Sequence, residues 1–141
     1  MFAITIKEPW AYTIFHHGKD IENRDWYFPL VEQEVAIHTS KNYGPGEIEA
    51  ASRYLQQMYG HEIDPTKLVL GSIVGVVRMG RPSRSSKSEW FFGEWGYPIA
   101  NARLLAEPIP FRGQTKFWEV PVEVEAVIRR TTVCEAYTIA P

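Results

Sequence analysis

The stretch 68–79, LVLGSIVGVVRM, is the most strand-like part of the chain and limits the possible folds more than any other segment. Its β-branched and aliphatic side chains favour extended backbone. Because the stretch is apolar on both faces, we expect a strand in the interior of a sheet rather than at its edge. Gly71 and Gly75 interrupt it, and this indicates a bend or bulge such as small β-barrels contain.

Shorter segments with the period-two pattern of strands lie on both sides of this stretch. They cover residues 2–6, 34–38, 95–99, 104–108, 116–120 and 122–128. Two other segments have helical features: one lies between Pro9 and Gly18, and the other covers residues 47–59 and ends at Gly60. Six or seven strands with two main helices predict the α+β class, built as a small mixed β-barrel.

The length of the chain limits how many domains it can form. A chain of 141 residues, 45% of them hydrophobic, is long enough for one packed core and too short for two. We therefore expect one domain over residues 1–141, in which residues 121–141 form a C-terminal extension that packs as an edge strand or lies loose. The apolar runs are too short to span a membrane, and residues 1–7 lack the charged start of a secretory signal. These features predict a cytoplasmic protein without a membrane partner. We also expect a monomer.

The overall charge argues against one class of partner. The chain has 15 Lys and Arg residues against 17 Asp and Glu residues, a net charge of −2, so we expect no strong binding of duplex DNA. One segment is locally basic, with Arg78, Arg81, Arg84 and Lys87 before the next acid at Glu89. This segment is either a solvated loop or an arm that contacts phosphate.

Metal-binding residues are few. Cys134 is the single cysteine, which excludes thiolate zinc clusters. His16 and His17 are adjacent and would point in different directions on a helix, and His38 and His61 stand alone in the sequence. We expect neither a metal site nor a cofactor.

Residues 18–24, GKDIENR, concentrate charged side chains directly after the first predicted helix. On an extended backbone Glu22 and Arg24 share one side, together with Trp26. Glu22 also follows Lys19 closely enough to pair with it, and a paired Lys19 stays charged and suits an anchor for phosphate or a carbonyl group. Two interpretations remain open: an ion-pair network that fixes the junction of helix and strand, and the wall of a ligand cleft.

These charged residues resemble the signature of the ASCH family, Gly-x-Lys-x-x-Glu-x-Arg. Gly18, Lys19, Glu22 and Arg24 are the counterparts of its four fixed positions. Flanking segments occur in the expected order, namely Pro9-Trp10, residues 35–38, residues 71–76 and residues 104–113. Together they are similar to the branch that contains the endothelial-overexpressed lipopolysaccharide-associated factor. The similarity covers roughly residues 4–120; the loop 81–95 and the tail after Pro121 lie outside it.

The resemblance implies a PUA-like β-barrel that binds RNA or a modified nucleobase in a cleft beside the motif. Some members are hydrolases, so the alternative is a metal-independent ribonuclease or an amidohydrolase acting on N4-acetylcytidine-type nucleosides. The amidohydrolase branch has threonine at the position of Glu22 and takes an acid from elsewhere, for which Glu89 or Glu94 would be the counterpart. A third interpretation is a protein-interaction module.

The predicted site residues follow from these interpretations. If the protein is an enzyme, the catalytic candidates are Lys19, Glu22 and His38, because carboxylates and imidazoles transfer protons near neutral pH. The predicted ligand-binding residues are Trp10, Lys19, Glu22, Arg24, Trp26, His38, Tyr43 and Arg112. The aromatic residues in this set have a second interpretation, because Trp10 and Trp26 suit core packing as well as stacking on a base.

Overall fold

The computed structural model describes residues 1–43 and 46–135. Their elements follow in the order β1 (Phe2–Ile6), α1 (Trp10–His16), β2 (Ile21–Arg24), β3 (Gln33–Thr39), α2 (Glu47–Tyr59), a short 3₁₀ helix (Pro65–Lys67), β4 (Ser72–Met79), β5 (Trp95–Pro110), β6 (Phe117–Glu119), α3 (Val122–Thr131) and β7 (Thr132–Glu135). The predicted α+β class is confirmed. Gly44 and Pro45 of the predicted polar loop and residues 136–141 of the predicted tail lie outside the described residues.

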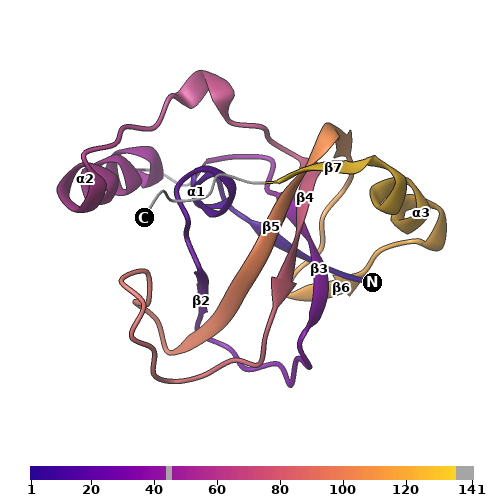
Figure 1. Cartoon of the computed structure of the whole chain (residues 1–141), viewed down its shortest axis with the longest axis horizontal. Helices are drawn as coiled ribbons and strands as arrows, with labels where there is room; N and C mark the ends of the chain where they lie inside the picture. The colour runs from indigo at the N-terminus through magenta and orange to yellow at the C-terminus, as the bar shows by residue number, and fades with distance from the viewer. Residues whose placement is uncertain (44–45, 136–141) are drawn as a thin grey trace.

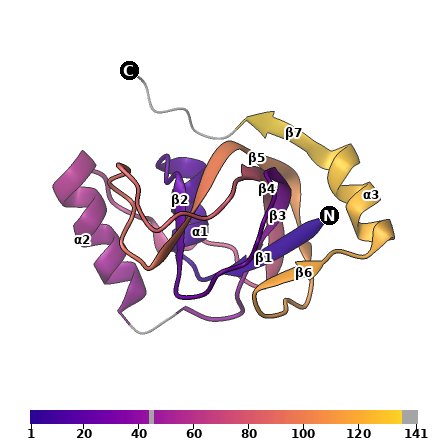
Figure 2. The same ribbon diagram turned by 90° about the horizontal axis from the view of Figure 1, so that it is seen from below.

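One curled sheet forms the body of the molecule, in the order β2-β5-β4-β3-β1-β6, with β7 pairing β5 beside this path. β1 and β3 run parallel, and the other pairings are antiparallel. Figures 1 and 2 show the sheet between α2 and α3, which lie at opposite ends of the molecule. The sheet is a half-barrel that is not closed: within the described ranges, β2 and β6 end its path.

β4 occupies the interior position that its apolar sequence predicts. It pairs with β3 on one side and β5 on the other, and its residues are buried except for Arg78. The pairing of β4 with β5 shifts register between Ile73 and Gly75, so the predicted irregularity is present near Gly75. Such shifts bend a sheet and help it to curl.

α1 places the charged segment at the end of a packed element. Ala11, Ile14 and Phe15 are buried in the main core, so the helix is held against the sheet. Gly18 follows with φ +71°, the left-handed conformation that glycine adopts without steric cost. The chain turns there and enters β2, which brings Lys19 into the interior at 5% exposure.

α2 and the loop between β4 and β5 cover the outer side of β2. Ala51 and Leu55 of α2 form a second cluster with Ile21 and Trp90. The Tyr54 hydroxyl donates a hydrogen bond to the Glu89 carbonyl at 2.6 Å. The loop is therefore packed against α2 on one side and against the start of β2 on the other.

The predicted strand over residues 122–128 is wrong, because these residues belong to α3. The alternating pattern also places Val124 and Ile128 four residues apart, and both pack in the cluster beneath the helix. Glu125 pairs with Arg129 at 3.1 Å, an i,i+4 contact that stabilises helices. The chain therefore contains three α-helices in its described part, where two main helices were expected.

The predicted division into two strands, 95–99 and 104–108, is also wrong, because β5 continues through residues 101–103 as one strand. Asn101 lies inside β5 with φ +51°, a conformation that asparagine tolerates better than most residues. β5 pairs β2 through its first residues and β4 through later ones, so this one strand connects the end strand β2 to the interior of the sheet. None of the helices in the described ranges is both long and apolar enough to cross a bilayer.

Candidate functional site

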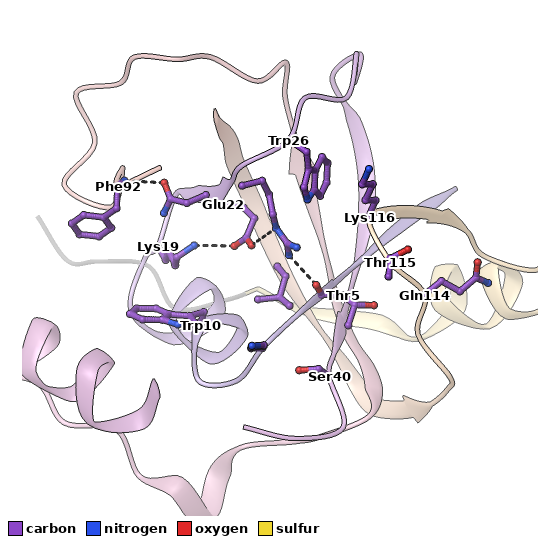
Figure 3. A pocket seen from close by; sticks show the side chains of 14 residues that line it. Thr5, Trp10, Lys19, Glu22, Trp26, Ser40, Phe92, Gln114, Thr115 and Lys116 are labelled. Carbon is purple, nitrogen blue, oxygen red and sulfur yellow. Dashed lines mark hydrogen bonds and ion pairs between the residues drawn. The ribbon is translucent and has the colours of Figure 1, made fainter. Parts of the chain in front are cut away.

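A cavity of about 580 Å³ opens beside the charged segment of β2 (Figure 3). Its walls come from the end of β1, the start of α1, β2, the loop before β5 and the loop before β6. The lining residues are Thr5, Ile6, Lys7, Trp10, Lys19, Glu22, Asn23, Arg24, Trp26, Ser40, Phe92, Gln114, Thr115 and Lys116. Of the predicted ligand-binding residues, the structure brings Trp10, Lys19, Glu22, Arg24 and Trp26 together here.

A chain of ion pairs runs along the wall of this cavity. Lys19 Nζ lies 3.0 Å from Glu22 Oε1, and Arg24 Nε lies 2.9 Å from Glu22 Oε2. Lys19 also donates to the Ile21 carbonyl, and Arg24 Nη2 donates to the Thr5 carbonyl at 2.9 Å. The predicted pairing of Lys19 with Glu22 is confirmed, and Arg24 ties the pair to β1.

Glu22 is ionised in this arrangement. Burial of the side chain would raise its pKa, but the charges of Lys19 and Arg24 and their hydrogen bonds more than offset burial, so the pKa lies below its ordinary value. Each carboxylate oxygen accepts a charge-assisted bond. Glu22 is therefore a fixed negative charge that orients two cations, and it is poorly suited to take up a proton.

Three aromatic side chains line the cavity. Trp10 is held by a hydrogen bond from its Nε1 to Glu47 Oε2 at 2.7 Å. Trp26 has two cations near its ring, with Arg24 at 5.5 Å and Lys116 at 6.0 Å from the ring centroid. Phe92 is 65% exposed although it is apolar. An exposed aromatic ring at a cavity offers a surface on which a planar ligand can stack.

Asn23 fixes the loop that carries Phe92. Its Oδ1 accepts hydrogen bonds from the backbone N–H groups of Phe92 at 2.9 Å and Gly93 at 3.2 Å. Its Nδ2 donates to the Trp90 carbonyl at 2.8 Å. Asn23 therefore holds the aromatic loop at the edge of the cavity. Figure 3 shows Phe92 of this loop at the upper left.

Two exposed lysines complete the charge of the cavity. Lys7 follows β1, and Lys116 precedes β6. Among the described side chains, those of residues 1–43 and 46–131, neither lysine has an acidic partner within salt-bridge distance. With Lys19 and Arg24 against Glu22, the lining carries a net positive charge and suits an anionic ligand.

His38 and Arg112 line a second cavity, of about 750 Å³. His38 Nε2 lies 2.7 Å from the Phe111 carbonyl, which can only accept, so this nitrogen carries the proton. His38 Nδ1 then accepts from Thr5 Oγ1 at 3.1 Å. Burial lowers the pKa of His38, although the bond to Phe111 raises it. Both ring nitrogens of His38 are thus used within the protein.

The remaining sequence candidates lie elsewhere. Tyr43 is 39% exposed on the loop after β3. Glu89 accepts from the Tyr59 hydroxyl at 2.9 Å and so faces α2, and Glu94 is exposed. Among the described residues that line the first cavity, Glu22 is the one acid. No group of three or more His, Cys, Asp or Glu side chains in the described ranges could hold a metal ion.

The sequence patterns missed several residues of the first cavity, among them Thr5, Asn23, Phe92 and Lys116. Asn23 lies inside the charged segment, between two of its predicted residues. Phe92 belongs to the aromatic group of the long loop, and a long loop in a small domain is a signal for function. Thr5 and Lys116 lie within predicted strands, and no local pattern distinguishes them from the other strand residues.

Comparisons with known proteins assign the chain to no family. No family model matches the chain, and no curated protein matches it. The likeness to the ASCH signature therefore depends on the residues themselves. Lys19, Glu22 and Arg24 keep the spacing Lys-x-x-Glu-x-Arg, whereas Gly18 directly precedes Lys19 and the signature leaves one residue between them.

Proposed function

We propose that the chain is an RNA- or nucleotide-binding domain of the ASCH family, whose half-barrel corresponds to the PUA-like barrel. One observation carries this proposal: the ion pairs of buried Lys19 and Glu22 with half-buried Arg24 form a wall of the cavity. Three aromatic side chains line the same cavity, those of Trp10, Trp26 and Phe92. We expect the protein to act as a cytoplasmic monomer.

The chemistry of the lining fits a nucleotide. Stacking on an aromatic side chain contributes about 1–3 kcal/mol per base and tolerates different bases. Lys7 and Lys116 are exposed and lack acidic partners in the described ranges, so they suit contacts with phosphate. Ser40 and Gln114 add neutral hydrogen-bonding groups that suit the edge of a base.

The same geometry favours binding over hydrolysis. A general base needs a pKa near the working pH, whereas the pKa of Glu22 is lowered and both of its oxygens are occupied. His38 lines the second cavity, and both of its nitrogens bond to the protein. Hydrolase activity is therefore not part of the proposal.

A binding titration tests the proposal. Fluorescently labelled single-stranded oligocytidylate is titrated with the wild type and with Lys7→Gln/Lys116→Gln, which removes two exposed cations from the cavity. We expect the double variant to bind about tenfold more weakly. Loss of two phosphate contacts should also reduce the slope of log affinity against log salt by about 1.4.

The matched control is Arg53→Gln/Arg130→Gln, which removes two exposed cations from α2 and α3. Its affinity should stay close to that of the wild type. Equal losses in the two double variants, or absence of binding by the wild type at low salt, would contradict the proposal. Incubation with N4-acetylcytidine and with oligoribonucleotide in EDTA should leave both compounds intact.

A further inference from the structure

The second cavity adjoins the first. Thr5, Ser40 and Gln114 line both cavities, so the two share a wall formed by the end of β1, the residue after β3 and the loop before β6. Each volume alone, about 580 Å³ and about 750 Å³, is in the range that holds one drug-sized ligand. Together they exceed what a single nucleoside needs.

Basic residues are concentrated along this joined surface. Lys41 and Arg112 line the second cavity, and its described lining includes no acid. Neither residue has an acidic partner within salt-bridge distance among the side chains of residues 1–43 and 46–131. In a protein with a net charge of −2, cations along two adjoining cavities indicate a ligand with a negatively charged backbone.

The loop that forms the shared wall is fixed before any ligand binds. Phe111 stacks on Trp118 with ring planes 4° apart and centroids 5.6 Å apart. The Phe111 N–H donates to the Gly71 carbonyl at 3.1 Å, and its carbonyl accepts from His38. These contacts hold the start of the loop, so Arg112 and Gln114 are carried by an anchored segment. Such pre-organisation lowers the entropic cost of binding.

We infer that the two cavities form one groove for a single-stranded oligonucleotide of at least two nucleotides. The first cavity takes a base against its aromatic side chains, and Lys41 and Arg112 in the second hold the phosphate that links it to the next nucleotide. This inference rests on the proposed function and adds the class of ligand: a phosphodiester-linked chain rather than a free nucleoside.

Isothermal titration with two ligands tests the inference. Cytidine supplies a base without phosphate, and the dinucleotide cytidylyl-cytidine supplies two bases joined by one phosphodiester. The wild type should bind the dinucleotide at least about tenfold more tightly than cytidine. Lys41→Gln/Arg112→Gln should lose most of this difference and keep the wild-type affinity for cytidine. Both side chains are exposed, so the variant should keep its fold.

Arg53→Gln/Arg130→Gln again serves as the matched control and should keep the full preference for the dinucleotide. Equal affinity of the wild type for the two ligands would overturn the inference and leave the proposed function standing. Equal weakening of dinucleotide binding in the two double variants would also overturn the inference and leave the proposed function standing. If the wild type binds neither cytidine nor the dinucleotide, the proposed function fails together with the inference.

Discussion

Lys19 and Glu22 form a buried ion pair, with Nζ 3.0 Å from Oε1 and side chains that are 4% and 8% exposed. The pair links Lys19, which follows the turn at Gly18, to β2. Arg24 donates hydrogen bonds both to Glu22 and to the Thr5 carbonyl, and so connects the pair to β1. It also forms part of the wall of a cavity. The two interpretations of the charged segment, a structural network and a cleft wall, are therefore compatible in one geometry.

Glu22→Gln should destabilise the protein strongly, because it leaves the buried Lys19 ammonium without its counter-charge. Removal of one partner of a buried pair costs about 3–5 kcal/mol, and we expect a loss of this size by urea unfolding at pH 7. Because the pKa of Glu22 is lowered in the folded state, its carboxylate stabilises the protein above pH 4.5. This stabilisation is lost as the pH falls through the folded-state pKa. The difference in the free energy of unfolding between Glu22→Gln and the wild type should therefore become smaller in that acidic range.

Glu32→Gln provides the control for this prediction. Glu32 pairs with Arg78 at 3.2 Å, but the two side chains are 66% and 44% exposed. Exposed pairs contribute about 0–1 kcal/mol, so this variant should unfold close to the wild type. Similar losses for the two variants would show that the Lys19–Glu22–Arg24 network is not the stabilising feature we infer.

Glu8 should make the protein less stable as the pH rises. Burial raises the pKa of this carboxyl group from its ordinary value of 4.5 to about 7, although the N–H groups of Tyr12 and Val69 donate to it. The folded state holds the proton more tightly than the unfolded state. The stabilisation is therefore complete below pH 4.5 and is lost as the pH rises to about 7. The loss amounts to about 1.4 kcal/mol per pH unit.

The measurement is urea unfolding of the wild type and Glu8→Gln at pH 5 and pH 8. The wild type should lose about 3 kcal/mol more between the two values than the variant, which has no carboxyl group to titrate. Histidines that titrate in the same interval affect both proteins alike, so the comparison isolates Glu8. A pH dependence that is identical in the two proteins would refute the assignment.

Gly113→Ala should destabilise the loop between the cavities. A Cβ atom at Gly113 would lie 2.6 Å from His38 Cε1 and 2.6 Å from Thr5 Oγ1, and both partners are held by hydrogen bonds. Overpacking of this kind costs about 1–3 kcal/mol. At Gly80 a Cβ atom would meet its nearest neighbour at 3.7 Å, so Gly80→Ala should change the free energy of unfolding little. Thermal and urea unfolding of both variants distinguish the two cases.

Phe92→Ala should weaken ligand binding without loss of stability. The ring is 65% exposed, so its removal uncovers little core, whereas loss of one stacking contact should reduce oligocytidylate affinity about tenfold. Tyr27→Ala is the matched control, because Tyr27 is 50% exposed and contacts Trp95 outside the cavity lining. If both variants bind as the wild type does, Phe92 has no part in the site.

The sequence predicted the elements whose signals are local. Pro9 and Gly18 bracket α1, the helical spacing and Gly60 give the bounds of α2, and the apolar run predicts the interior position of β4. The pairing of Lys19 with Glu22 was also predictable, because the two residues are three positions apart and the turn lies beside them.

The sequence did not predict features that depend on distant contacts. Val122–Thr131 alternates like a strand, and its helix is favoured by burial of Ile128 and by the Glu125–Arg129 pair. The contribution of Phe92 to the cavity depends on hydrogen bonds from its loop to Asn23, 69 residues away. The separation of His38 from the first cavity follows from strand register, which single-strand patterns do not specify.

The most direct test of the proposed site is the indole N–H region of a nitrogen-15 NMR spectrum during titration with cytidine 5′-monophosphate. The five tryptophans give at most five signals there. Binding in the first cavity should shift the signals of Trp10 and Trp26, which line it, and leave that of Trp90, which is buried beneath α2, unchanged. Shifts confined to Trp95, or no shift of Trp10 and Trp26 at saturating ligand, would contradict the assignment of this cavity as the nucleotide site.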